Sequence, residues 1–158
     1  MRPLSRRAAL AHGAFFGAAF SVAGATGMVG WSGEAFAAAK EAADEVAKFT
    51  GGKTPEQGRI SIELPEIAEN GNTVPLTVSV NAPMTAENYV SDVIVVSEGN
   101  PNPGVITFHF TPLSGKAEAQ TRIRLAATQN IVVVAKTSGG EFFIGQKQVK
   151  VTIGGCGG

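Results

Sequence analysis

The chain has 158 residues, with 13 basic and 13 acidic side chains, and its formal net charge at pH 7 is zero. This balance excludes the strongly basic surface that nucleic-acid binding requires. The single cysteine excludes an intramolecular disulfide, and the length favours one domain that is large enough to bury its own core.

The first 37 residues have the three parts of an export signal. A basic head holds Arg2, Arg6 and Arg7, a stretch of small and apolar residues follows, and residues 35–37 form an Ala-Phe-Ala cleavage site. The paired arginines resemble a twin-arginine signal. We expect cleavage after Ala37 and a periplasmic location, with an uncleaved membrane anchor as the alternative. Cleavage removes three arginines and one glutamate, which leaves a formal charge of −2 from ten basic and twelve acidic residues.

A short helix is expected next, over residues 38–52. From Ala38 to Phe49 the small and apolar residues fall on one helical face, and most charged residues fall on the other. The pair Gly51 and Gly52 ends this pattern, because glycine commonly follows the last turn of a helix.

Residues 53–153 are expected to form a β-sandwich domain. Apolar residues alternate with polar ones in short runs, as in 74–80, which is the period of a half-buried strand. Turn-forming residues separate the runs, which favours an antiparallel sandwich of about seven strands. Pro75 cannot donate a hydrogen bond within a sheet, so its strand is expected at an edge or at a bulge. The expected strands are residues 60–64, 74–80, 89–96, 105–110, 119–125, 131–136 and 141–153.

Side chains that could take part in catalysis are few on these strands. His109 is expected on the strand face opposite Phe108 and Phe110, and Arg122 and Arg124 share one outward face. Solvated charge is the expected role of the two arginines, with contact to an anion or a partner as the alternative. The sequence has no motif for a metal, for a nucleophile with its base, or for a phosphate. We therefore predict no catalytic residue, no metal site and no cofactor.

The C-terminal residues 154–158 read Gly-Gly-Cys-Gly-Gly. Glycine loses more backbone entropy on folding than any other residue, so this segment is not expected to stabilise the domain. When extended, it would hold the thiol of Cys156 about 10 Å from Ile153. We predict a reactive thiol on a thin, flexible arm that enters a narrow channel of another protein, and the alternative is a frayed terminus with an incidental cysteine. The predicted arm residues are Gly154, Gly155, Gly157 and Gly158.

The twin-arginine signal, the small all-strand domain and the terminal Gly-Gly-Cys-Gly-Gly together resemble the SoxY family of thiosulfate-oxidation carrier proteins. Further segments that resemble this family are residues 81–90, 99–103, 108–115 and 121–126. The resemblance implies an immunoglobulin-like fold and a carrier that is not itself an enzyme, with sulfur intermediates held covalently on Cys156.

Partners are implied by the same resemblance. Members of the family work as a heterodimer with SoxZ, while SoxAX-, SoxB- and SoxCD-type enzymes load, hydrolyse and oxidise the bound sulfur. Apolar residues expected to face outward, namely Val105, Phe143 and residues 93–96, are candidates for the SoxZ contact. An exposed thiol can also link two copies of the chain through Cys156. Contact with nucleic acid, or with a membrane after signal cleavage, is not expected.

Two other functions remain open. A stand-alone thiol sulfurtransferase would need a base or an anion site near Cys156, and His109 with Arg122 or Arg124 are the only nominees. A secreted interaction domain would instead use Cys156 for an intermolecular disulfide.

Overall fold

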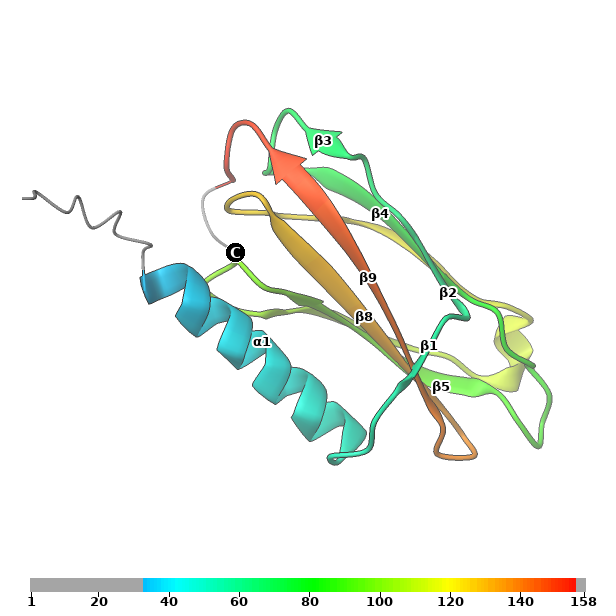
Figure 1. The fold of residues 1–158 in the computed structure, drawn as a ribbon. Coiled ribbons are helices and arrows are strands. Elements are labelled where there is room, and N and C mark those ends of the chain that lie inside the picture. The colour runs from blue at the N-terminus through cyan, green and yellow to red at the C-terminus, as the bar shows by residue number, and fades with distance from the viewer. Residues whose placement is uncertain (1–32, 156–158) are drawn as a thin grey trace, which may run out of the picture.

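Alternating apolar side chains build two β-sheets that pack face to face, and the fold is an immunoglobulin-like β-sandwich (Figure 1). The structure is a computed structural model, and it describes residues 33–155. Residues 1–32, which are most of the predicted signal segment, and residues 156–158 lie outside the described residues.

The larger sheet has the strand order β1 (Glu56–Gln57), β9 (Phe142–Val151), β8 (Gln129–Thr137), β5 (Val90–Ser97) and β6 (Gly104–His109), and β3 (Ile67–Ala68) also pairs with β9. The smaller sheet has the order β2 (Ile60–Glu63), β4 (Val74–Val80) and β7 (Ala117–Ile123), and a short 3-10 helix, η1 (Pro112–Ser114), lies between β6 and β7 in the chain. The seven predicted strands are present and pair antiparallel with one another. The two strands that were not predicted, β1 and β3, run parallel to β9. Each has only two residues, which is too short for an alternating pattern.

The middle of β8 is buried on both faces. Ile131, Val133 and Ala135 belong to the core between the two sheets. Val132 and Val134 point to the other face of the larger sheet, where they form a second apolar cluster. Burial on both faces explains why this segment is continuously apolar rather than alternating.

The helix α1 (Gly33–Thr50) covers that second cluster, and it lies across the outer face of the larger sheet in Figure 1. The rings of Phe49 and Phe142 meet edge to face, with centroids 6.0 Å apart and an interplanar angle of 79°. Val46 packs against the same cluster. Aromatic pairs in this geometry stabilise a contact by about 1 kcal/mol beyond the area that they bury.

The helix ends as predicted and begins earlier than predicted. Gly51 and Gly52 follow its last turn with φ angles of 62° and 80°, values that glycine adopts readily. The first helical residue is Gly33, although residues 38–52 were expected, because the alanine-rich segment before residue 38 also favours a helix. No helix in residues 33–155 is long and apolar enough to cross a membrane.

The prediction that the strand of Pro75 lies at an edge is wrong for the strand as a whole. The strand β4 is the middle strand of its sheet. However, β2 pairs only with residues 77–80 of β4, so Pro75 has a neighbouring strand on one side, where it pairs with Arg122. The missing N–H of proline is tolerated because the ladder on the other side has already ended.

The residues proposed to face a partner are mostly core residues, so that prediction is also wrong. Phe143 is 2% exposed, and Val93, Val95 and Val96 are at most 1% exposed. Val105 is half-buried and packs against the central core. The error arose because a strand covered on both faces has no outward side.

Candidate functional site

The chain is fixed where β9 ends, at residues 152–155, which we refer to as the arm root. The backbone N–H of Thr152 donates to the carbonyl oxygen of Ala68 at 3.0 Å, and its hydroxyl donates to the carbonyl oxygen of Glu69 at 2.9 Å. Figure 1 shows the red segment after β9 turning back beside the loop between β3 and β4. The arm root therefore returns toward the sandwich after β9 ends.

A series of backbone hydrogen bonds through Gly71 holds the arm root. The N–H of Gly71 donates to the carbonyl oxygen of Ile153 at 2.8 Å, and its carbonyl oxygen accepts from the N–H of Leu125 at 2.8 Å. The carbonyl oxygen of Leu125 in turn accepts from the N–H of Gly155 at 2.9 Å. Gly155 is buried. We refer to residue 71, residues 125–126 and residues 153–155 together as the clasp.

Glycine is required in the clasp because of space and not because of backbone conformation. Gly71, Gly154 and Gly155 do not have a positive φ. A Cβ atom at Gly71 would overlap the carbonyl oxygen of Leu125, and one at Gly154 would overlap that of Ala126. At Gly155 it would lie 2.8 Å from the carbonyl oxygen of Gly71. Three backbone segments thus approach one another more closely than any side chain would allow.

The structure gives Gly154 and Gly155 a packing role that the sequence did not predict. The clasp depends on contacts between segments that are far apart in the chain. The only sign of it in the sequence is that residues 71, 154 and 155 are all glycine. Cys156, Gly157 and Gly158 lie outside the described residues. The reactivity of the thiol and the flexibility of the arm therefore stay predictions.

Asn100 holds the backbone on both sides of Leu125 in place. Its side chain is 4% exposed, and its amide nitrogen donates to the carbonyl oxygen of Arg124 at 2.8 Å. Its amide oxygen accepts from the N–H of Ala126 at 2.9 Å and from the side-chain amide of Gln129 at 2.9 Å. Gln129 also accepts from the N–H of Gly99 at 2.7 Å. The buried amide network of Asn100 and Gln129, which the sequence did not predict, fixes the backbone of residues 124–126.

A cleft lies next to the clasp, between the edge strands β6 and β7. Its volume is about 260 Å³. Arg122 and Arg124 are exposed and share this side of the chain, as predicted, because Ile123 between them is buried. Neither arginine forms an ion pair within the described part of the chain. The cleft is lined by Asn100, Asn102, Gly104, Val105, Ile106, Arg122, Ile123 and Arg124.

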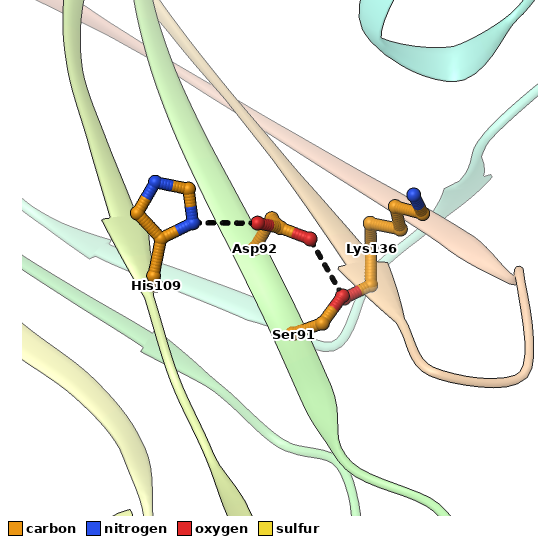
Figure 2. Close-up of polar contacts among 4 residues, drawn as sticks. All are labelled: Ser91, Asp92, His109 and Lys136. Carbon is orange, nitrogen blue, oxygen red and sulfur yellow. Dashed lines mark hydrogen bonds and ion pairs between the residues drawn. The ribbon is translucent and has the colours of Figure 1, made fainter.

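His109 forms a separate polar cluster at the far end of β6 (Figure 2). Its Nδ1 atom lies 2.7 Å from Oδ1 of Asp92, and the hydroxyl of Ser91 donates to Oδ2 of Asp92 at 2.7 Å. The side chain of His109 is 74% exposed. An ionised carboxylate only accepts hydrogen bonds, so Nδ1 of His109 carries the proton in this contact.

The pKa of Asp92 is lower than its ordinary value of 3.8. Partial burial would raise this pKa, but hydrogen bonds from Ser91 and His109 and the positive charges of His109 and Lys136 outweigh it. The carboxylate of Asp92 is therefore ionised at neutral pH and orients the imidazole ring.

The structure does not bring His109 together with Arg122 and Arg124. The cleft includes Gly104 at the start of β6, and His109 ends that strand five residues later, roughly 16 Å away. Within residues 33–155, no group of three or more His, Cys, Asp or Glu side chains is placed to hold a metal ion.

A family model and a solved structure agree on one family. A family model described as "Sulfur oxidation protein SoxY" matches residues 46–156. The solved structure of the sulfur carrier protein SoxY from Chlorobium limicola f thiosulfatophilum is 35% identical, with a TM-score of 0.60, over 73% of this chain and 99% of that chain. A superoxide reductase (neelaredoxin) from Ignicoccus hospitalis matches with a TM-score of 0.54 at 20% identity, over 60% of this chain and 80% of that chain, which shows a likeness of fold alone. A comparison with curated proteins found no match.

Proposed function

The chain belongs to the SoxY family, and from this premise we propose that it is a covalent carrier of sulfur intermediates in periplasmic thiosulfate oxidation. The attachment point is the thiol of Cys156. The observation that carries the proposal is the extent of the family match, which ends at Cys156 itself, directly after the clasp. A clasp that leads to the only thiol in the chain suits a protein that presents this thiol to others.

The chemistry needs a thiolate and separate catalysts. In loading, the thiolate sulfur of Cys156 forms a disulfide bond with the outer sulfur of thiosulfate, and two electrons pass to a haem c enzyme of the SoxAX type. In the next step, water attacks the terminal sulfonate sulfur, the bond between the two outer sulfurs breaks, and sulfate and two protons leave. A persulfide then remains on Cys156 for oxidation by a SoxCD-type enzyme.

The partner enzymes supply what the carrier lacks. A free cysteine has a pKa of about 8.5, so a minority of thiols is ionised near neutral pH without help. We propose that a SoxAX- or SoxB-type active site provides this help when the arm enters it. We further propose that the carrier acts as a heterodimer with SoxZ and reaches the periplasm by the twin-arginine route.

The clasp gives the arm two possible lengths. When it is closed, Cys156 follows directly after a fixed residue, and its Cα atom lies only about 3.8 Å from that of Gly155. When it is open, the chain is free from Ile153 onward and the thiol reaches about 10 Å. Opening costs the two hydrogen bonds of Gly155 and Ile153, about 1 kcal/mol each, so a partner channel can readily offset it.

A stand-alone thiol sulfurtransferase gains no support from the geometry. That function would need His109 near the arm, but His109 is held by Asp92 at the opposite end of β6 from the cleft. An intermolecular disulfide through Cys156 would not account for the family match.

Replacing the thiol tests the proposal. We expect Cys156→Ser to abolish thiosulfate-dependent electron transfer in a reconstituted system of purified carrier and partner enzymes. A matched control is Cys156→Ser combined with Ile153→Cys, which keeps one thiol at a position that is 68% exposed but moves it three residues back along the chain, into the arm root. This control should react with iodoacetamide and still fail to support turnover. Full activity of Cys156→Ser would refute the carrier function.

A further inference from the structure

We propose that Arg122 and Arg124 form an anion site that receives the sulfonate group of an intermediate bound to Cys156 while the clasp is closed. The inference rests on the proposed carrier function. It adds a site on the carrier itself, in the cleft between β6 and β7, that distinguishes a loaded arm from an empty one.

The path of the arm root leads toward this cleft. Gly154 lies against the carbonyl oxygen of Ala126, and the N–H of Gly155 donates to the carbonyl oxygen of Leu125. The arm root and residues 125–126 therefore run in opposite directions. Leu125, the hydrogen-bond partner of Gly155, is the chain neighbour of Arg124. Consecutive Cα atoms are about 3.8 Å apart, so a thiol one residue beyond this fixed root can reach the neighbouring cleft.

The cleft has the form and the charge of an anion site. Its volume of about 260 Å³ is sufficient for a tetrahedral oxyanion, and none of the residues that line it is acidic. Arg122 and Arg124 flank the buried Ile123, so their guanidinium groups project from the same side of the segment. The hydrogen bond from Asn100 to the carbonyl oxygen of Arg124 fixes the backbone that carries the second guanidinium.

The guanidinium groups of the two arginines can donate hydrogen bonds to a ligand. Neither takes part in an ion pair within the described residues. A guanidinium group donates two parallel hydrogen bonds, which match two oxygens of a sulfonate as they match those of a carboxylate or phosphate. A neutral thiol offers no such acceptor, so the attraction exists only when the arm carries an oxyanion. A loaded arm would thus rest against the carrier until a partner enzyme draws it away.

An exchange reaction on the purified chain tests the site without any partner enzyme. Cys156 is first converted to its mixed disulfide with 2-mercaptoethanol, which is uncharged, and the protein is then equilibrated with sulfite and 2-mercaptoethanol. Sulfite attacks the sulfur of Cys156, the disulfide bond breaks, a bond to the sulfonate sulfur forms, and 2-mercaptoethanol leaves as its thiolate. Mass spectrometry of the two protein forms gives the equilibrium constant.

We expect Arg124→Gln and Arg122→Gln each to lower this equilibrium constant roughly twofold to fivefold, as for a partly exposed charge pair. The matched control is Lys150→Gln, which removes the same charge from an exposed residue that is the nearest basic one to Cys156 in sequence. It should leave the constant unchanged. The arginine effect should shrink in about 1 M sodium chloride, where the screening length is about 3 Å.

An unchanged constant in both arginine variants, or an equal decrease in Lys150→Gln, would overturn the anion site. Such a result would leave the carrier function intact if Cys156→Ser still abolishes turnover. Conversely, an active Cys156→Ser variant would remove the carrier function whatever the exchange reaction shows, so the two failures are distinguishable.

Discussion

The clasp and the His109–Asp92 pair lie at different places on the sandwich and differ in what their residue types suggest. The pair consists of an imidazole, a carboxylate and a nearby hydroxyl, which are the groups that many catalytic sites use. The clasp consists of glycines and backbone atoms. Yet His109 is largely exposed and distant from the cleft, whereas Gly71, Leu125 and Gly155 of the clasp are buried, and Cys156 follows the clasp in the chain.

This difference shows that position decides function here more than residue type does. A histidine that is 74% exposed and fixed to one carboxylate behaves as a surface ion pair, and such pairs contribute about 0–1 kcal/mol. Glycines whose neighbours leave no room for a Cβ atom allow the backbone segments of the clasp to pack together, and this packing fixes the arm root.

Opening the clasp should have the largest effect. Gly71→Ala introduces a methyl group against the carbonyl oxygen of Leu125, so all three hydrogen bonds of the clasp should be lost, at a cost of about 3 kcal/mol. Urea unfolding measures this loss, and amide hydrogen exchange at Gly155 should become fast. Gly139→Ala is the matched control, because its Cβ atom would meet only the hydroxyl of Thr137 at 3.7 Å. Slow exchange at Gly155 in Gly71→Ala would contradict the packing role of the clasp.

Removing the support of the clasp should have a smaller effect. Asn100→Ala leaves the N–H of Ala126 without its acceptor and the carbonyl oxygen of Arg124 without the amide that donates to it, and the expected loss of stability is about 2 kcal/mol. Asn130→Ala is the comparison, because its amide makes one hydrogen bond, to Glu98, and the expected loss is at most about 1 kcal/mol. Thermal unfolding of both variants measures the difference. Equal destabilisation would mean that the Asn100 network does not support the arm root.

The His109–Asp92 pair should show the smallest effect, and only at low pH. The pKa of Asp92 is lower in the folded chain than its ordinary value of 3.8, so the unfolded chain binds more protons in this range. Its stabilising contribution is therefore complete above about pH 5 and is lost as the pH falls through the folded pKa. Because His109 is largely exposed, solvent screens its interaction with Asp92, and the contribution is less than about 1 kcal/mol. Urea unfolding of Asp92→Asn at decreasing pH should show a weaker loss of stability than the original chain.

His109→Gln completes the comparison between the two regions. This variant removes the imidazole and leaves the arm root unchanged, so we expect full activity in the reconstituted thiosulfate assay. A large loss of turnover in His109→Gln would favour the sulfurtransferase alternative. It would mean that the His109–Asp92 pair, and not only the arm root, serves the function.

Local patterns in the sequence were sufficient for the seven antiparallel strands and for the end of the helix, but not for β1 and β3. The alternation in residues 74–80 and the pair Gly51 and Gly52 each depend on neighbours in the chain. The clasp and its support could not be predicted in this way, because Gly71, Asn100 and Gly155 acquire their roles only when distant segments meet. The fold also reversed the expectation for Phe143, which is covered although its strand was expected to have an outward apolar side.

The mass of the C-terminal peptide shows whether sulfur intermediates are carried on Cys156. The protein would be isolated from cells that are oxidising thiosulfate, with its thiols blocked at the moment of lysis, and the peptide that contains Cys156 would be weighed. The account predicts a population of peptides with sulfonate or sulfane sulfur bound to this residue, which a reductant removes. A peptide that carries only the blocking group, under conditions in which thiosulfate is being consumed, would contradict it.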